Sequence, residues 1–416
     1  MFSPSLFTLL LTLFLNTSAS ASASPLPFSD LLSDPSSSIT LPLAKRFNHT
    51  GSANVVKFDQ ARAKAIRARS QQNGGSSAVE YAATSGTGKA FNQQATSQVV
   101  SYVVTLLVDT GSSNTWVGAA KPYMPSESTE FTGDAVAVEY GSGAFAGFEV
   151  LDTITLADGL TLYNQSIGVA LTAEGFDGID GILGYVPHLS GSFPTNPDKC
   201  VPTVTDTAWD AGLLDHYAVG ISFHPSEDEE QINGELTYGG VDRTKFDGPI
   251  HYVPLTTTPS ASEYVGYDQS ITYGDNTTIL RTSAGILDTG TTLILIATDA
   301  FQEYQNVTGG VPDDDTGLLR ITEEQYGNLQ DLYFNIGEVK YALTPNAQIW
   351  PRALNEEIGG TTDGIYLIVN DLGSLSGQGL DFINGMSFLE RFYAVYDIGN
   401  SRVGLAETPY TRAETN

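Results

Sequence analysis

The sequence predicts a mainly β protein made of two similar lobes that meet at a cleft. From about Ser76 onward, short runs of Val, Ile, Leu, Tyr and Thr alternate with Gly, Asp and Asn, which is typical of strands joined by turns. A short acidic motif occurs twice, once in each half of this region. With 416 residues, the chain is long enough for two domains that each have a core.

Individual elements follow from the same pattern. Strands are expected at Val136–Tyr140, Ile154–Leu156, Leu236–Tyr238 and Ile294–Ala297. Short helices are expected near Thr203–Ala211 and Ala297–Tyr304, and Gln60–Ser70 has a helical composition within an otherwise extended N-terminal segment.

The repeat covers more than the acidic motif. Leu106–Ser113 reads LLVDTGSS, and Gly285–Thr292 reads GILDTGTT. An apolar run that closes on glycine follows each copy, at Gly181–Gly184 and at Phe382–Gly385. Each half therefore offers one carboxylate in the same local setting.

Asp109 and Asp288 are the candidate catalytic carboxylates. Each follows an apolar run, which brings it to the end of a buried strand, and precedes Thr-Gly, where glycine permits a tight turn. Two facing acids share one proton, so the ionised member can activate water while the protonated member polarises a carbonyl. Ser112 and Thr291 are expected to donate to the carboxylates. The residues expected to support the pair are Thr110, Gly111, Ser112, Thr289, Gly290 and Thr291.

Charge divides the chain into two parts. The net charge of -29 argues against a nucleic-acid partner. Seven of the 19 Lys and Arg residues lie between Lys45 and Arg69, whereas only 12 bases against 45 acids follow Gly75. The basic segment is therefore interpreted as an intramolecular cover for the acidic body, with a disordered basic arm as the alternative.

The N-terminal region indicates export. Residues 1–21 resemble a signal peptide, 22–75 form the basic segment, and 76–245 and 246–416 are the expected lobes. A secreted, extracellular protein without a membrane anchor is expected, with the vacuole as the alternative. Cys200 is the single cysteine, so no internal disulfide is expected. Asn-x-Ser/Thr sequons begin at Asn48, Asn164, Asn276 and Asn306.

Longer motifs carry a family resemblance. Val108–Val117 and Ile286–Thr292 match the two active-site motifs of the pepsin-type aspartic proteases, and the chain is most similar to the secreted fungal branch of basidiomycetes. Gly234–Asp242 resembles the segment before the lobe crossover, and Phe388–Asp397 with Arg402–Ala406 resembles the C-terminal signature. The similarity extends from about Thr105 to Thr408.

This resemblance implies a bilobal pepsin-like acid protease fold, with two pseudo-twofold-related β-barrel-like lobes and an active-site cleft between them. It also implies a monomeric aspartic endopeptidase that cuts polypeptides at acid pH between bulky apolar residues, without a cofactor or metal. Leu107, Tyr140 and Phe145 are the candidates for the apolar lining.

The resemblance further implies a mobile hairpin, or flap, over the cleft. Tyr140, Gly141 and Ser142 match its substrate-binding tip, and Trp116 is expected to hydrogen-bond the flap tyrosine.

The basic segment then corresponds to an inhibitory propeptide that places a lysine against the aspartates. The candidates are Lys57 and Lys64, and Lys45-Arg46 has the form of a dibasic processing site.

Two features depart from the family. Gln98–Val104 runs directly into Thr105–Asp109 without the usual Gly/Pro turn, so a hairpin is shortened or missing, and an unpaired edge with a misplaced Asp109 is expected. Asn384 stands where an apolar residue is expected, opposite Leu183 of the other half, and a buried amide there needs hydrogen-bond partners.

Two other functions were weighed against the endopeptidase. A catalytically impaired relative that binds peptides or proteins is the alternative favoured by the shortened hairpin. A two-carboxylate glycosidase normally holds its acids in unlike surroundings, whereas these two are nearly identical. Cys200 and the scattered histidines give no support to thiol or metal catalysis.

Overall fold

The computed structural model describes residues 39–47, 55–72, 91–99, 102–141, 143–185, 201–226 and 232–416. The predicted signal peptide, Asn48, Cys200 and the flap residue Ser142 lie outside these ranges.

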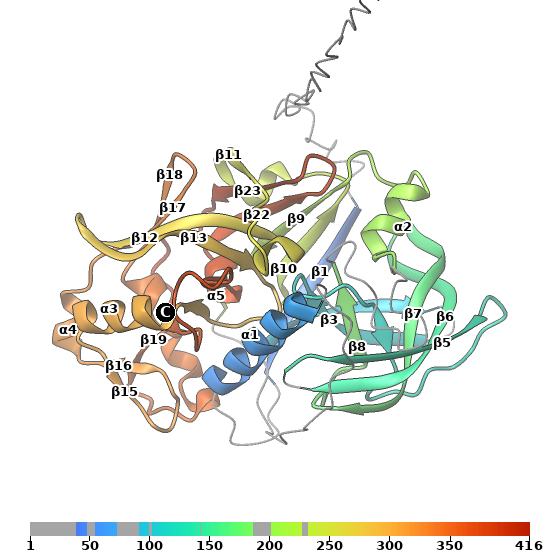
Figure 1. Ribbon diagram of the computed structural model, residues 1–416, viewed down its shortest axis with the longest axis horizontal. Helices are drawn as coiled ribbons and strands as arrows, with labels where there is room; N and C mark the ends of the chain where they lie inside the picture. The colour runs from blue at the N-terminus through green and yellow to red at the C-terminus, as the bar shows by residue number, and fades with distance from the viewer. Residues whose placement is uncertain are drawn as a thin grey trace, which may run out of the picture.

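The described residues form a mainly β fold with two lobes (Figure 1). The largest sheet has 13 strands in the order β11-β23-β22-β9-β10-β1-β2-β3-β8-β4-β7-β6-β5, so strands from both halves of the chain share it. In chain order these are β1 (Ile39–Phe47), β2 (Phe91–Val99), β3 (Tyr102–Asp109), β4 (Trp116–Val117), β5 (Glu130–Glu139), β6 (Ala144–Ala157), β7 (Leu160–Glu174), β8 (Gly181–Gly184), β9 (Ala218–Phe223), β10 (Ile232–Tyr238), β11 (Asp247–Pro254), β22 (Phe392–Asp397) and β23 (Arg402–Glu407).

Two smaller sheets belong to the C-terminal half. A seven-stranded sheet runs β18-β17-β12-β13-β21-β14-β20, and a three-stranded sheet runs β15-β16-β19. Their strands are β12 (Gly266–Tyr273), β13 (Thr277–Leu287), β14 (Ile294–Ile296), β15 (Val311–Pro312), β16 (Leu319–Ile321), β17 (Leu332–Ile336), β18 (Val339–Leu343), β19 (Ile365–Leu367), β20 (Val369–Asp371) and β21 (Phe382–Asn384).

The duplication seen in the sequence is present in the strand pairing. In the first half, β3 pairs parallel with β8, β8 pairs antiparallel with β4, and β4 pairs parallel with β7. In the second half, β13, β21, β14 and β20 repeat these three pairings in the same order and sense. Each acidic motif therefore follows the first strand of an equivalent four-stranded unit.

The expectation of an unpaired edge before Asp109 is wrong. β2 pairs antiparallel with β3 from Gln94↔Leu107 to Val99↔Tyr102, which leaves only two residues for the connection. β3 also pairs with β8, so the strand that leads to Asp109 has a neighbour on both sides. The hairpin is present, and its first strand β2 pairs with the backbone of β3.

The helices are α1 (Val55–Gln72), α2 (Val204–Asp210), α3 (Thr298–Thr308), α4 (Glu323–Gly327) and α5 (Met386–Leu389). The expected helices at 203–211, 297–304 and 60–70 correspond to α2, α3 and α1, and α1 is longer than expected at both ends. α1 lies between the two lobes, across the region where the strands of both halves approach each other (Figure 1).

The buried positions of α1 follow the spacing of one helix face. Val55, Asp59, Arg62 and Ile66 are buried at steps of three and four residues, and their neighbours Val56, Phe58 and Ala63 are buried as well. Lys57 and Lys64 are exposed on another face. The helix therefore presents one carboxylate and one guanidinium to the interior among apolar side chains.

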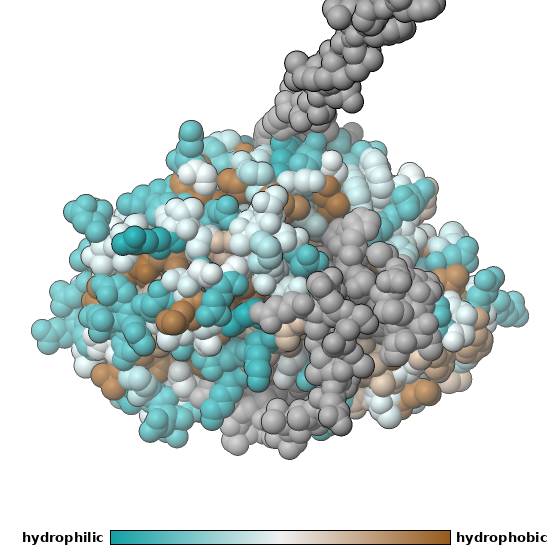
Figure 2. Space-filling model, in the orientation of Figure 1, coloured by the Kyte–Doolittle hydropathy of each residue, from teal (hydrophilic) through white to brown (hydrophobic). Residues whose placement is uncertain are grey.

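One part of the surface is largely polar. Hydrophilic residues cover much of the half of Figure 2 that holds α3 and α4, in agreement with the acidic composition. No helix among the described residues combines the length and the apolar character needed to cross a bilayer.

Candidate active site

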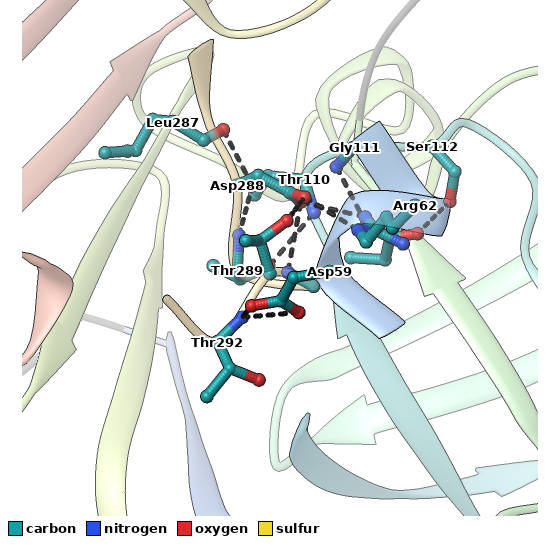
Figure 3. Close-up of polar contacts among 12 residues, drawn as sticks. Asp59, Arg62, Thr110, Gly111, Ser112, Leu287, Asp288, Thr289 and Thr292 are labelled. Carbon is teal, nitrogen blue, oxygen red and sulfur yellow. Dashed lines mark hydrogen bonds and ion pairs between the residues drawn. The ribbon is translucent and has the colours of Figure 1, made fainter. Parts of the chain in front are cut away.

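Asp109 and Asp288 lie close together, since Nη2 of Arg62 contacts both carboxylates, and Figure 3 shows Thr110 of the first acidic loop beside Asp288 and Thr289 of the second. The threonines that follow them hold the two loops together: Thr110 N–H donates to Thr289 Oγ1 at 3.0 Å, and Thr289 N–H donates to Thr110 Oγ1 at 2.9 Å. Each threonine hydroxyl also donates to a carbonyl of the opposite strand, Leu287 at 3.2 Å and Val108 at 2.9 Å. This reciprocal set of four hydrogen bonds fixes the two carboxylates relative to each other.

The first carboxylate is held within its own loop. Asp109 is fully buried and accepts from Gly111 N–H at 2.8 Å and from the Ser112 hydroxyl at 2.5 Å.

The second carboxylate has equivalent partners. Asp288 is also fully buried and accepts from Gly290 N–H at 3.0 Å and from the Thr291 hydroxyl at 2.6 Å. The hydroxyl donors expected from the sequence are thus present on both sides, and each carboxylate is fixed before any substrate arrives.

Glycine is required in both loops because each loop approaches the opposite carboxylate. A Cβ atom on Gly111 would lie 2.7 Å from Asp288 Oδ1, and one on Gly290 would lie 2.9 Å from Asp109 Oδ1. A side chain at either position would push the two acids apart.

The cation that faces the pair is Arg62 of α1, and the expectation of Lys57 or Lys64 is wrong. Arg62 is 2% exposed; its Nε donates to Asp288 Oδ2 at 2.7 Å, and its Nη2 donates to Asp288 Oδ1 at 2.9 Å and to Asp109 Oδ1. The two lysines lie on another face of the helix, so neither can turn toward the site. The planar guanidinium also reaches both acids at once, which a single ammonium does less well.

Arg62 and the acids perturb one another electrostatically. Burial acts to raise the pKa of Asp288, but the Arg62 guanidinium and the hydrogen bonds from Thr291 and Gly290 hold that pKa below its ordinary value. Burial likewise acts to lower the pKa of Arg62, and the two carboxylates raise it above its ordinary value. The helix therefore stabilises the ionised form of Asp288.

Asp59, one turn before Arg62, is a second buried charge that the sequence analysis did not single out. Its carboxylate accepts from Leu293 N–H at 2.8 Å and from Thr292 N–H at 3.1 Å, just beyond the second acidic loop (Figure 3). Burial raises the pKa of Asp59 to about 7, although these hydrogen bonds and Arg62 act to lower it. Its spacing of three residues from Arg62 on a helical pattern was the available signal.

The flap candidates lie against α1. Tyr140 N–H donates to the Gly143 carbonyl at 2.7 Å and closes the turn between β5 and β6. Gly141 has a φ of +77°, and a Cβ there would lie 2.3 Å from the Ala61 carbonyl oxygen, so only glycine lets the turn approach the helix this closely. Arg69 lies 5.4 Å from the centroid of the Tyr140 ring.

The candidate Trp116 packs beside the flap tyrosine. The rings of Trp116 and Tyr140 are stacked with centroids 6.4 Å apart, and both side chains are buried. Trp116 Nε1 and the Tyr140 hydroxyl form no hydrogen bond of ordinary geometry among the described residues, but the Trp116 side chain acts as a hydrogen-bond partner that lowers the pKa of Tyr140 against the rise that burial causes.

The apolar candidates gather under the flap. Leu107, Tyr140 and Phe145 belong to one buried cluster with Trp116 and Phe176. The Phe145 ring stacks on Trp116 at 4.2 Å.

Asn384 has the partners that its position requires. Its Nδ2 donates to the Tyr267 hydroxyl at 2.6 Å and to Gln269 Oε1 at 2.9 Å, and Gln269 Nε2 donates back to Asn384 Oδ1 at 3.4 Å. Asn384 pairs with Leu287 of β13, and its carbonyl accepts from Asp288 N–H at 3.2 Å. The amide is therefore satisfied within the C-terminal half and supports the strand that leads to Asp288.

Comparisons with known proteins identify relatives of this chain. Residues 100–408 match the family described as eukaryotic aspartyl protease. The chain is 52% identical to polyporopepsin from Irpex lacteus, over 77% of this chain and 98% of that protein, and 29% identical to pepsin A from Sus scrofa, over 73% and 77%. The crystal structure of an aspartic proteinase from Irpex lacteus superposes with a TM-score of 0.77 at 52% identity, covering 78% of this chain and 96% of that one.

Proposed function

The chain belongs to the eukaryotic aspartyl protease family and is an aspartic-type endopeptidase, and on this premise we propose that Asp109 and Asp288 are its catalytic pair. The observation that carries the proposal is the reciprocal bonding of two equivalent acidic loops, which holds two buried carboxylates face to face.

The chemistry follows from that arrangement. Two adjacent carboxylates cannot both ionise without strong repulsion, so once Arg62 leaves they share one proton. The ionised member removes a proton from a water molecule, and the protonated member donates to the carbonyl oxygen of the scissile peptide. Ser112 and Thr291 keep the two carboxylates in position through their hydroxyl groups. Sharing a proton requires acid conditions, so acid pH is part of the proposal.

The flap and the apolar cluster define the substrate. We assign Tyr140, Gly141 and Ser142 to the cover over a bound polypeptide, with Trp116 as the support for Tyr140. The cluster that contains Leu107 and Phe145 favours bulky apolar residues around the scissile bond.

α1 is the inhibitory element of the proposal. Residues 22–75 act as the propeptide, and Arg62 neutralises the pair while α1 occupies the space that substrate needs. Export, a monomeric state and N-glycosylation belong to the same proposal. Asn164, Asn276 and Asn306 are exposed, which suits glycosylation.

The test is hydrolysis of denatured haemoglobin at about pH 3–4 after acid treatment of the exported protein, with and without pepstatin. Cleavage that pepstatin abolishes supports the catalytic pair. A folded protein that binds pepstatin without cleaving any substrate would contradict the proposal and favour a catalytically impaired relative that binds peptides.

A further inference from the structure

α1 brings a second arginine to the wall of the C-terminal lobe, five residues beyond Arg62. Arg67 is partly buried, and its Nη2 donates to the Leu372 carbonyl at 3.4 Å. Gln60, seven residues earlier on the same helix, donates to the Asp371 carbonyl at 2.9 Å. Two polar side chains of α1 thus reach two consecutive carbonyls at the end of β20.

Two carboxylates of this wall act on the Arg67 guanidinium. Burial acts to lower the pKa of Arg67, whereas the Asp381 and Asp371 carboxylates act to raise it, which places both acids within electrostatic reach of the guanidinium. Burial outweighs the two acids, so the pKa of Arg67 is lowered, and the hydrogen bond to the Leu372 carbonyl is the direct contact that holds the guanidinium at this wall.

Both carboxylates are held in place independently of α1. Asp371 Oδ1 accepts from the Thr298 hydroxyl at 2.6 Å and from Gly373 N–H at 2.7 Å. Asp381 is 1% exposed and accepts from the N–H groups of Gly377 and Gln378 at 2.7 and 3.1 Å. Because every one of these donors belongs to the C-terminal half, the acids remain oriented when the helix departs.

We propose that Asp371, Leu372 and Asp381 form a basic-residue subsite, which binds a lysine or arginine side chain of the polypeptide substrate after α1 has left. The inference rests on the proposed function, and it restricts the favoured substrates to polypeptides with a basic residue near the scissile bond. In the unprocessed chain, Arg67 occupies the place that the substrate side chain would take. In the same way, Arg62 covers the two carboxylates that would face the scissile bond.

The spacing places the basic residue along the substrate. Five helical residues rise about 7.5 Å between Arg62 and Arg67, and an extended peptide covers that distance in about two residues. The favoured substrates therefore carry Lys or Arg two residues from the scissile bond, in addition to bulky apolar residues at that bond.

Matched peptides test the subsite on the acid-processed protein. Each internally quenched peptide has bulky apolar residues on both sides of the scissile bond. One pair of peptides carries lysine or norleucine two residues before this bond, and a second pair carries them two residues after it. We expect kcat/KM for the lysine peptide to exceed that for the norleucine peptide about 5- to 10-fold on one side. Asp371→Asn should reduce this ratio toward one, whereas Asp314→Asn, at an exposed acid of the same lobe, should retain it.

The outcomes separate this inference from the proposed function. Cleavage of both peptides at equal rates overturns the subsite and leaves the endopeptidase intact. If neither peptide is cleaved, the catalytic proposal fails. The subsite is then tested by the stability of the unprocessed chain, in which Arg67 still contacts this wall. In the unprocessed chain, urea denaturation gives the loss of unfolding free energy for Arg67→Gln, for Asp371→Asn and for the double variant. If Asp371 interacts with the Arg67 cation, the loss in the double variant should differ from the sum of the two single losses. Losses that add up overturn the inference.

Discussion

At the scale of single residues, Asp109 and Asp288 act together: one accepts a proton from water, and the other donates a proton to the carbonyl oxygen of the substrate. Asp109→Asn and Asp288→Asn should therefore each lower kcat at least about 10³-fold, with little further loss in the double variant. Peptide hydrolysis measures the loss, and Asp314→Asn is the control for loss of an acid elsewhere. A single variant with more than a tenth of the normal rate would show that the two carboxylates do not act together.

The contribution of Asn384 to stability depends on the side chains that it hydrogen-bonds. Asn384→Leu removes the amide that serves Tyr267 and Gln269, and leaves a buried hydroxyl and a buried amide without that partner. We expect the free energy of unfolding to fall by about 1–3 kcal/mol, measured by urea denaturation. Asn276→Gln, at an exposed position, should change it by less than about 0.5 kcal/mol. An unchanged midpoint in Asn384→Leu would mean that the amide network contributes nothing to stability.

These residues also mark how far the sequence could predict the site. The Asp-Thr-Gly repeat identified both acids and their hydroxyl donors because the whole arrangement is local in sequence. Asn384 was recognised as unusual, but its partners Tyr267 and Gln269 lie more than 110 positions away, on a strand that meets it only in the folded sheet.

At the scale of elements, α1 combines two groups with opposite responses to pH. Asp288, whose pKa is lowered in the folded chain, contributes stability that is present above its ordinary pKa and lost as the pH falls through the lowered value. Asp59, whose pKa is raised to about 7, contributes stability that is fully present below its ordinary pKa and lost as the pH rises through about 7. The unprocessed chain should therefore hold α1 most firmly at mildly acidic pH.

Asp59→Asn tests the upper limit of this range. The neutral amide avoids the burial of a charge, so the variant should become more stable relative to the unmodified chain as the pH rises. From pH 5 to pH 8, the difference in unfolding free energy between the two proteins should grow by on the order of 3 kcal/mol. Urea denaturation of the unprocessed chain at both pH values measures the change, and Lys64→Gln on the exposed face is the control. An equal difference at both pH values would show that Asp59 does not titrate in this interval.

The helix also shows why the sequence predicted a cation over the acids but not the right one. The charge asymmetry of the chain identified the basic segment, and its composition identified a helix. The face that turns inward depends on what the helix packs against: Asp59 and Arg62 are buried together because the acidic loops and the residues just beyond them supply both a carboxylate pair and N–H donors. Neither partner is visible from the helix sequence alone.

At the scale of the whole molecule, β1 connects the two parts of the largest sheet. It pairs with β10 on one side and β2 on the other, and β10 and β2 do not pair with each other in the described residues. Leu41 and Leu43 are buried in the core, and Lys45-Arg46 lies within the strand opposite Gln93 and Asn92. Cleavage at the dibasic pair would therefore require β1 to open locally first.

If residues 22–75 are removed as proposed, β1 is part of the unprocessed chain only, and a core substitution in it distinguishes the two forms. Leu43→Ala should lower the free energy of unfolding of the unprocessed chain by about 2–4 kcal/mol, because it leaves a cavity at a fully buried position. Pro42→Ala, at an exposed position in the same strand, is the control. After acid processing, the Leu43→Ala protein should unfold at the same urea concentration as the unmodified protein. Persistence of the defect after processing would instead show that β1 stays in the sheet and that only the segment around α1 is released.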